Sequence, residues 1–84
     1  MLLRIDTFEV NGTTVIQVIG QLVDEGVAEF ETMLQNVKAP WTVDVSLLRT
    51  ADAKGITTLR SIVEAGGELR NVSPYIRLLM NRET

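Results

Sequence analysis

The spacing of apolar residues switches repeatedly between two periods along the 84 residues of this chain. Residues 3–10 alternate apolar and polar side chains, which is the period of a half-buried strand. Asn11 and Gly12 follow, and because both tolerate positive φ angles the pair predicts a tight hairpin. Residues 14–19 are β-branched and almost continuously apolar, which is typical of an interior strand, and Gly20 is predicted to end it. The chain is therefore expected to begin with two paired strands.

The next segment has the three-to-four-residue spacing of an amphipathic helix. Its apolar positions are Val27, Phe30, Leu34 and Val37. Asp24 is the predicted N-cap, and Glu25 places a negative charge at the positive end of the helix dipole. Lys38 is expected in the last turn and Pro40 blocks continuation, so the helix is predicted to end near residue 38.

Alternation returns in residues 41–47, which predicts a third strand. The side chains expected to point into the core are Val43, Val45 and Leu47. A short loop is then expected to lead into a second helix, with Asp52 as its N-cap and Gly66–Gly67 as its left-handed stop. The apolar positions of this helix are Ile56, Leu59, Ile62 and Val63.

Residues 68–72 predict a short fourth strand, and Ser73 followed by Pro74 predicts a third helix with a serine N-cap. The buried stripe of this helix is expected at Ile76, Leu79 and Met80. The predicted order is β-β-α-β-α-β-α, which implies an α/β fold with a mixed four-stranded sheet packed with helices. A chain of this length is expected to form a single domain, residues 1–84.

The chain contains neither Cys nor His. Their absence excludes disulfides, thiolate or imidazole metal sites, and catalysis by Cys or His. Without a matched acid–base pair or a phosphate-binding loop, we expect no enzyme activity, no cofactor and no metal. The formal net charge of −3 argues against nucleic acid as a partner. No apolar run reaches the roughly 18–20 residues that span a bilayer, and no export signal is recognisable, so the sequence predicts a cytoplasmic protein without membrane insertion.

Several local strings, in order across nearly the whole chain, resemble the STAS domain, the module of bacterial anti-sigma factor antagonists and of sulfate-transporter cytoplasmic tails. GQLVD at residues 20–24 is similar to the family's G-x-L-D turn, and VDVS at 43–46 to its V-D-L-S strand. DAKGI at 52–56 falls where the family has D-S-S-G-L. GGELRNVSP at 66–74, with IRLL at 76–79, resembles the G-G-x-L-x-L-x-x-P segment and the helix after it. The family usually continues with a further strand and helix, which this sequence lacks.

The resemblance implies a non-catalytic protein-interaction module in bacterial signalling and transcription regulation, whose partner is an anti-sigma factor with serine kinase activity. The partner-binding residues it implies are Asp52, Ala53, Lys54, Gly55, Thr57 and Thr58. In phosphorylation-regulated members the kinase modifies a serine at the position of Ala53. Alanine has no oxygen to accept a phosphate, so we expect constitutive binding rather than a phosphorylation switch.

Two further functions remain open. One is a soluble STAS-like accessory subunit of a membrane lipid or anion transport complex, a role that requires no phosphorylation. The other is a nucleotide- or anion-binding domain, because residues 53–55 offer backbone N–H groups at a helix start and Lys54 adds a positive charge.

Three expectations concern the surface. Asp44 is expected to be exposed or hydrogen-bonded to a neighbouring loop rather than catalytic. Tyr75, in the first turn of the last helix, is expected to be half-exposed, and a contact anchor is the alternative to an ordinary surface residue. Residues 1–48 are net acidic and residues 49–84 net basic, which favours a homodimer. Its contact is expected near Ile76, Leu79 or Met80.

Overall fold

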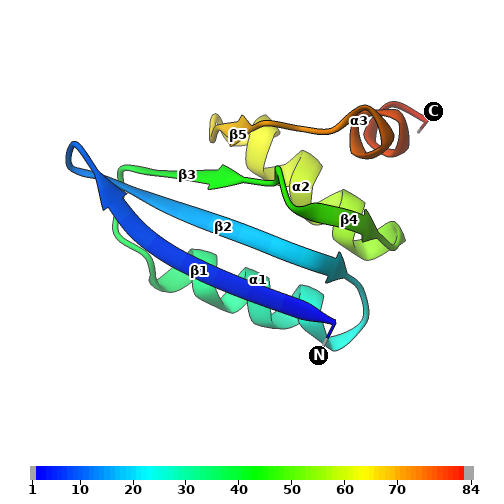
Figure 1. Ribbon diagram of the computed structural model, residues 1–84, viewed down its shortest axis with the longest axis horizontal. Helices are drawn as coiled ribbons and strands as arrows, with labels where there is room; N and C mark the ends of the chain where they lie inside the picture. Colours follow the sequence, from blue (N-terminus) through cyan, green and yellow to red (C-terminus); the bar gives the residue numbers. More distant parts are fainter. Residues whose placement is uncertain (1, 83–84) are drawn as a thin grey trace.

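The computed structural model describes residues 2–82 and contains one mixed sheet packed against helices (Figure 1). Its elements in chain order are β1 (Leu3–Val10), β2 (Thr13–Leu22), α1 (Glu25–Asn36), β3 (Trp41–Asp44), β4 (Leu48–Ala51), α2 (Ala53–Glu64), β5 (Leu69–Arg70) and α3 (Pro74–Asn81). The predicted α/β class, the opening hairpin and the order of the helices are confirmed.

The sheet is built around β2. β1 pairs with β2 in the antiparallel sense, whereas β3 and β4 pair in parallel with its first and second halves. β5 pairs in parallel with β3, so the order is β1-β2-β3-β5 with β4 beside β2. The prediction of four strands is therefore wrong: the segment expected as a loop before the second helix is β4. Four residues are too few to show a period, and only pairing with β2 makes this segment a strand.

β3 ends earlier than the alternation of residues 41–47 predicts. A carboxylate oxygen of Asp44 accepts a hydrogen bond from the Ser46 N–H at 2.8 Å, which turns the chain out of the ladder. Leu48 N–H then donates to the Val45 carbonyl at 3.1 Å, closing the turn. Val43 and Val45 are buried as predicted, but the prediction for Leu47 is wrong: it lies in this turn and is 52% exposed.

The hairpin turn has the predicted geometry, with φ of 52° at Asn11 and 84° at Gly12. The prediction that the second strand ends at Gly20 is wrong, because β2 continues to Leu22. Gly20 has a φ of 98°, and its α-carbon packs against the Leu2 carbonyl, where a side chain has no room. The pairing of β2 with β4 shifts register directly after it, so Gly20 marks an irregularity within the strand rather than its end.

α1 and α2 lie behind the sheet in Figure 1, and α3 packs beside α2 and β4. The core joins residues of the sheet and of all three helices, and its fully buried side chains are Ile16, Val18, Leu22, Phe30, Val43, Val45, Leu59 and Ile76. α1 ends at Asn36 rather than near residue 38, because Val37 is already extended and packs against the core. No helix within residues 2–82 is long and apolar enough to cross a bilayer.

Candidate functional site

Two helices start side by side at one end of the sheet. β2 and β4 are parallel neighbours, and their last residues, Leu22 and Ala51, are paired. Each strand leads within a few residues into a helix, α1 after β2 and α2 after β4. In α/β proteins the carboxyl ends of parallel strands are the usual place for binding residues, because the loops that follow them gather there.

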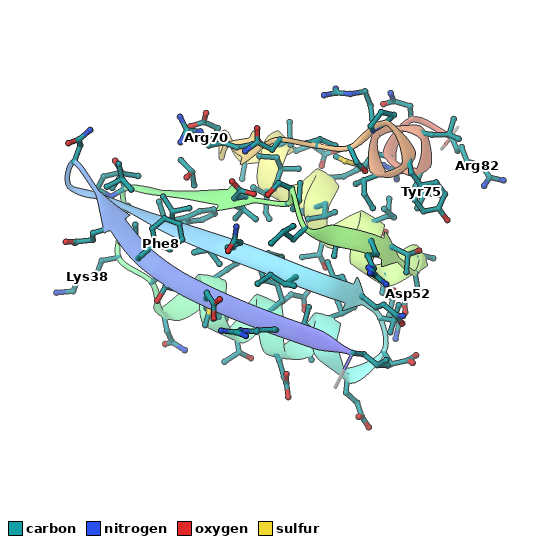
Figure 2. All side chains as sticks on the ribbon, viewed as in Figure 1. Phe8, Lys38, Asp52, Arg70, Tyr75 and Arg82 are labelled. Carbon is teal, nitrogen blue, oxygen red and sulfur yellow. The ribbon has the colours of Figure 1, made fainter. Side chains whose placement is uncertain are left out.

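Asp52 joins these two helix starts (Figure 2). One of its carboxylate oxygens accepts from the Gly55 N–H at 2.8 Å, so Asp52 is the N-cap of α2 as predicted. The other oxygen accepts from the Asp24 N–H at 2.9 Å, on the loop before α1. These two hydrogen bonds, first that from Asp24 and then that from Gly55, hold the pKa of Asp52 below its ordinary value, and the Lys54 charge adds to the effect.

Asp24 does not act as the sequence predicts. It stands at the N-cap position of α1, but its side chain accepts no capping hydrogen bond and its φ is 53°. The prediction of a side-chain cap is therefore wrong. The left-handed backbone of Asp24 instead directs its N–H toward Asp52, a residue 28 positions further along the chain. The carboxylate of Asp52 thus serves the starts of both helices.

A shallow groove of about 370 Å³ runs between the first halves of α1 and α2; we call it the α1–α2 groove. Its lining residues are Asp24, Val27, Ala28, Glu31, Ala53, Lys54, Thr57 and Thr58. The small side chains of Ala28 and Ala53 leave the groove open, and the side chain of Val27 is buried. Thr58 ties the two helices together, because its hydroxyl lies 2.7 Å from a Glu31 carboxylate oxygen and 3.0 Å from the Lys54 carbonyl.

The structure places the predicted partner-binding residues at two depths. Ala53, Lys54 and Thr57 are exposed, and Asp52 is half-buried beside them. Gly55 and Thr58 are buried; Thr58 is only 5% exposed. Gly55 packs against the Leu22 carbonyl and the Ala51 side chain, so it faces the sheet and has no room for a side chain.

Sequence reasoning about the loop missed the α1 side of the groove, which consists of Asp24, Val27, Ala28 and Glu31. The helical spacing of Val27 identified this residue as buried, but periodicity does not reveal which neighbouring helix it faces. The signal available was the string at residues 20–24, which marks the turn into α1.

A second groove of about 360 Å³ lies on the other side of α2, toward α3. Its lining residues are Ala51, Asp52, Ala53, Ile56, Thr57, Arg60, Leu79 and Arg82. Arg60 spans it from α2, donating a hydrogen bond from Nε to the Met80 carbonyl at 2.9 Å. Ala53 and Thr57 line both grooves, so they form the ridge between them.

The remaining surface predictions have mixed outcomes. Asp44 accepts hydrogen bonds from Ser46 and, at 2.9 Å, from the Asn71 side chain, as expected for a residue tied to a neighbouring loop. Partial burial opposes ionisation of Asp44, but these bonds and the nearby Arg70 outweigh it and lower its pKa. Tyr75 is half-exposed, at 51%. The dimer contact expected near Ile76, Leu79 or Met80 stays a prediction, although Ile76 itself is fully buried against the core.

Comparison with known proteins does not assign this chain to a family. No family model matches the sequence, and no curated protein matches it. Within residues 2–82, no group of three or more acidic side chains is arranged to hold a metal ion.

Proposed function

We propose that this chain is a non-catalytic protein-binding module that docks its partner on the start of α2 and in the α1–α2 groove. The observation that carries the proposal is the position of Ala53. It is the first residue of α2, it is exposed, and it forms part of the ridge between two grooves. Its methyl side chain is small, so another protein surface can approach the backbone at the start of α2 closely.

The hydrogen bonds of Asp52 favour a protein partner over a phosphate or a nucleotide. A helix start attracts anions through its free N–H groups. Here the carboxylate of Asp52 already accepts from Gly55 and from Asp24, and these hydrogen bonds hold its pKa below the ordinary value. A bound phosphate would have to displace this carboxylate or lie against its negative charge. The anion-binding alternative is therefore the weaker one.

The groove also indicates the chemistry of the partner. Val27, Ala28 and Ala53 give the groove an apolar lining, to which Asp24 and Glu31 add carboxylates. A helix that presents small apolar residues together with Lys or Arg complements such a surface. We propose an anti-sigma factor of the serine kinase type as the partner, in a cytoplasmic pathway that regulates transcription. Because Ala53 accepts no phosphate, binding is constitutive.

The second candidate is an accessory subunit of a membrane lipid or anion transport complex. It is favoured by the same observation, because docking on a transporter component requires no phosphate at position 53. The two candidates share the binding surface and differ in the identity of the protein that occupies it.

Affinity purification from the native cell tests the proposal. We expect wild-type protein to co-purify with one partner in near-stoichiometric amount, and Ala53→Asp to lose it, because the new carboxylate is desolvated in the contact. Thr32→Asp is the matched control: it adds the same charge on an exposed position of α1 outside the groove and retains the partner. Circular dichroism checks that both variants fold. An aspartate at the start of α2 is compatible with the helix dipole, which limits the change in stability to about 0.3–1 kcal/mol.

Mass spectrometry of the retained protein separates the two candidates: a serine kinase supports the first, and a transport ATPase or permease supports the second. If Ala53→Asp and Thr32→Asp retain the same partner equally, the proposed binding surface is wrong. If neither protein class is recovered with the wild type, both candidate functions are wrong.

A further inference from the structure

β1 forms a free edge of the sheet (Figure 1). It is eight residues long and pairs with β2 without a register shift from Leu3 to Val10. Within residues 2–82, no strand pairs with its outer side. It contains no proline and no bulge, two of the features by which natural sheets block their edges. β5, at the opposite edge, has only two residues.

The backbone of β1 presents alternate residues to each side. The Gln21 N–H donates to the Leu2 carbonyl at 2.7 Å, so the even-numbered residues of this strand direct their N–H and C=O groups toward β2. The groups of the odd-numbered residues therefore point outward. These residues are Leu3, Ile5, Thr7 and Glu9. An added antiparallel strand would bond to them.

The side chains of β1 also separate into two faces. Leu3 and Ile5 pack against the core, so alternation places Arg4, Asp6 and Phe8 on the face away from α1 and α2. Figure 2 shows Phe8 on this open face. Arg4 Nε lies 3.2 Å from an Asp6 carboxylate oxygen, and the two side chains are 69% and 38% exposed. Opposite charges thus stand two residues apart on an exposed edge.

We propose that two copies of this chain associate through β1, antiparallel, with Ile5 of one copy opposite Ile5 of the other. In this register Arg4 of each copy lies opposite Asp6 of the second copy, on the same face. Leu2, which is 57% exposed, lies opposite Phe8, which is 47% exposed. The pairs Leu3–Thr7 and Ile5–Ile5 bring together the outward-pointing backbone groups. The two sheets then continue into each other across a twofold axis.

The charges select this register over its neighbours. A twofold axis at Arg4 places two guanidinium groups opposite each other, and an axis at Asp6 places two carboxylates opposite each other. Like charges directly across a strand pair are destabilising. An axis at Thr7 sets Asp6 against Phe8 and forms no ion pair. The axis at Ile5 brings unlike charges into the non-hydrogen-bonded pairs, where side chains approach most closely.

Sedimentation equilibrium of charge-swap variants tests the proposal. Each copy carries a net charge of −3, so general repulsion opposes association, and the measurement is made at high protein concentration and moderate salt. We expect wild type to reach twice the monomer mass. Arg4→Asp and Asp6→Arg each create like-charge pairs across the axis, and we expect each to raise the dissociation constant about tenfold. The double variant Arg4→Asp/Asp6→Arg restores both pairs and the dimer.

Two further variants test whether β1 forms the dimer contact, and both leave Arg4 and Asp6 unchanged. Thr7→Pro removes an outward-pointing N–H and leaves the β2 ladder intact, so it is expected to be a folded monomer. Leu78→Asp alters the most exposed apolar residue of α3 and is expected to leave the dimer unchanged. Circular dichroism checks the fold of each variant.

Three outcomes overturn the proposal: a wild type that stays monomeric at the highest concentration, a double variant that fails to restore the dimer, or a dimer that dissociates with Leu78→Asp but persists with Thr7→Pro. None of the β1 variants touches the α1–α2 groove, so this test stands apart from that of the proposed function.

Discussion

At the scale of single residues, Asp52 carries the largest structural role at the candidate site. One carboxylate holds the start of α2 through Gly55 and the loop before α1 through Asp24. Its pKa is lowered from 3.8, so the ionised form is more stable in the folded chain than in the unfolded chain. The stability that it contributes is therefore complete above its ordinary pKa and is lost as the pH falls through the lower folded pKa.

Asp52→Asn tests this dependence on pH. Asparagine retains an oxygen for the Gly55 N–H, but its amide nitrogen cannot accept from the Asp24 N–H. We expect the free energy of unfolding at neutral pH to drop by about 1 kcal/mol. The difference from wild type should shrink in acid, as the pH falls through the lowered pKa of the wild-type carboxylate and protonates it. Urea unfolding at neutral and at acid pH measures it. A difference that is equal at both would show that the charge of Asp52 contributes nothing.

At the scale of the elements, α3 depends on few buried contacts. Ile76 is its one fully buried residue, and Ser73 caps the helix by accepting from the Ile76 N–H at 3.1 Å. The helix packs beside α2 and β4, and Arg60 of α2 reaches the Met80 carbonyl near its end. A short helix of this kind is held by its buried side chain rather than by its own backbone.

Ile76→Ala is therefore expected to destabilise the protein by about 2–5 kcal/mol, through lost apolar burial and the cavity that remains. Leu78→Ala is the control in the same helix: Leu78 is 57% exposed, and we expect a change within about 0.5 kcal/mol. Both are measured by urea unfolding. Similar losses for the two variants would contradict the assigned packing of α3.

At the scale of the whole molecule, size makes association consequential. A chain of 84 residues buries a modest share of its surface, so each added contact is a large fraction of the total stability. If two copies pair along β1, association stabilises the folded state by mass action.

The melting temperature of wild type should then rise with protein concentration. That of Thr7→Pro should stay constant, because this variant lacks an outward N–H that the β1 contact uses. Scanning calorimetry over about a hundredfold range of protein concentration measures the melting temperatures of wild type and Thr7→Pro. A wild-type melting temperature independent of concentration would contradict association through β1.

The sequence by itself determined those features whose causes lie within a few residues. Side-chain period places the first strand and the helices, the Asn11–Gly12 pair makes the hairpin turn, and Asp52 and Ser73 cap their own helices. Each of these depends on neighbours along the chain, so a pattern in the sequence carries it. The same locality explains why the start of the second helix, where part of the candidate site lies, was predictable from Asp52 and the apolar spacing after it.

Only the tertiary structure decided the features that join distant segments. Leu48–Ala51 is a strand because β2 lies beside it, and the Asp24 N–H finds its acceptor in Asp52, 28 residues further along the chain. Thr58 is buried because α1 brings Glu31 to its hydroxyl. The α1–α2 groove and the free edge of β1 likewise follow from the order of strands and the packing of helices. Pairing and packing between distant segments do not alter the apolar spacing within either segment. The sequence pattern alone therefore does not predict these contacts.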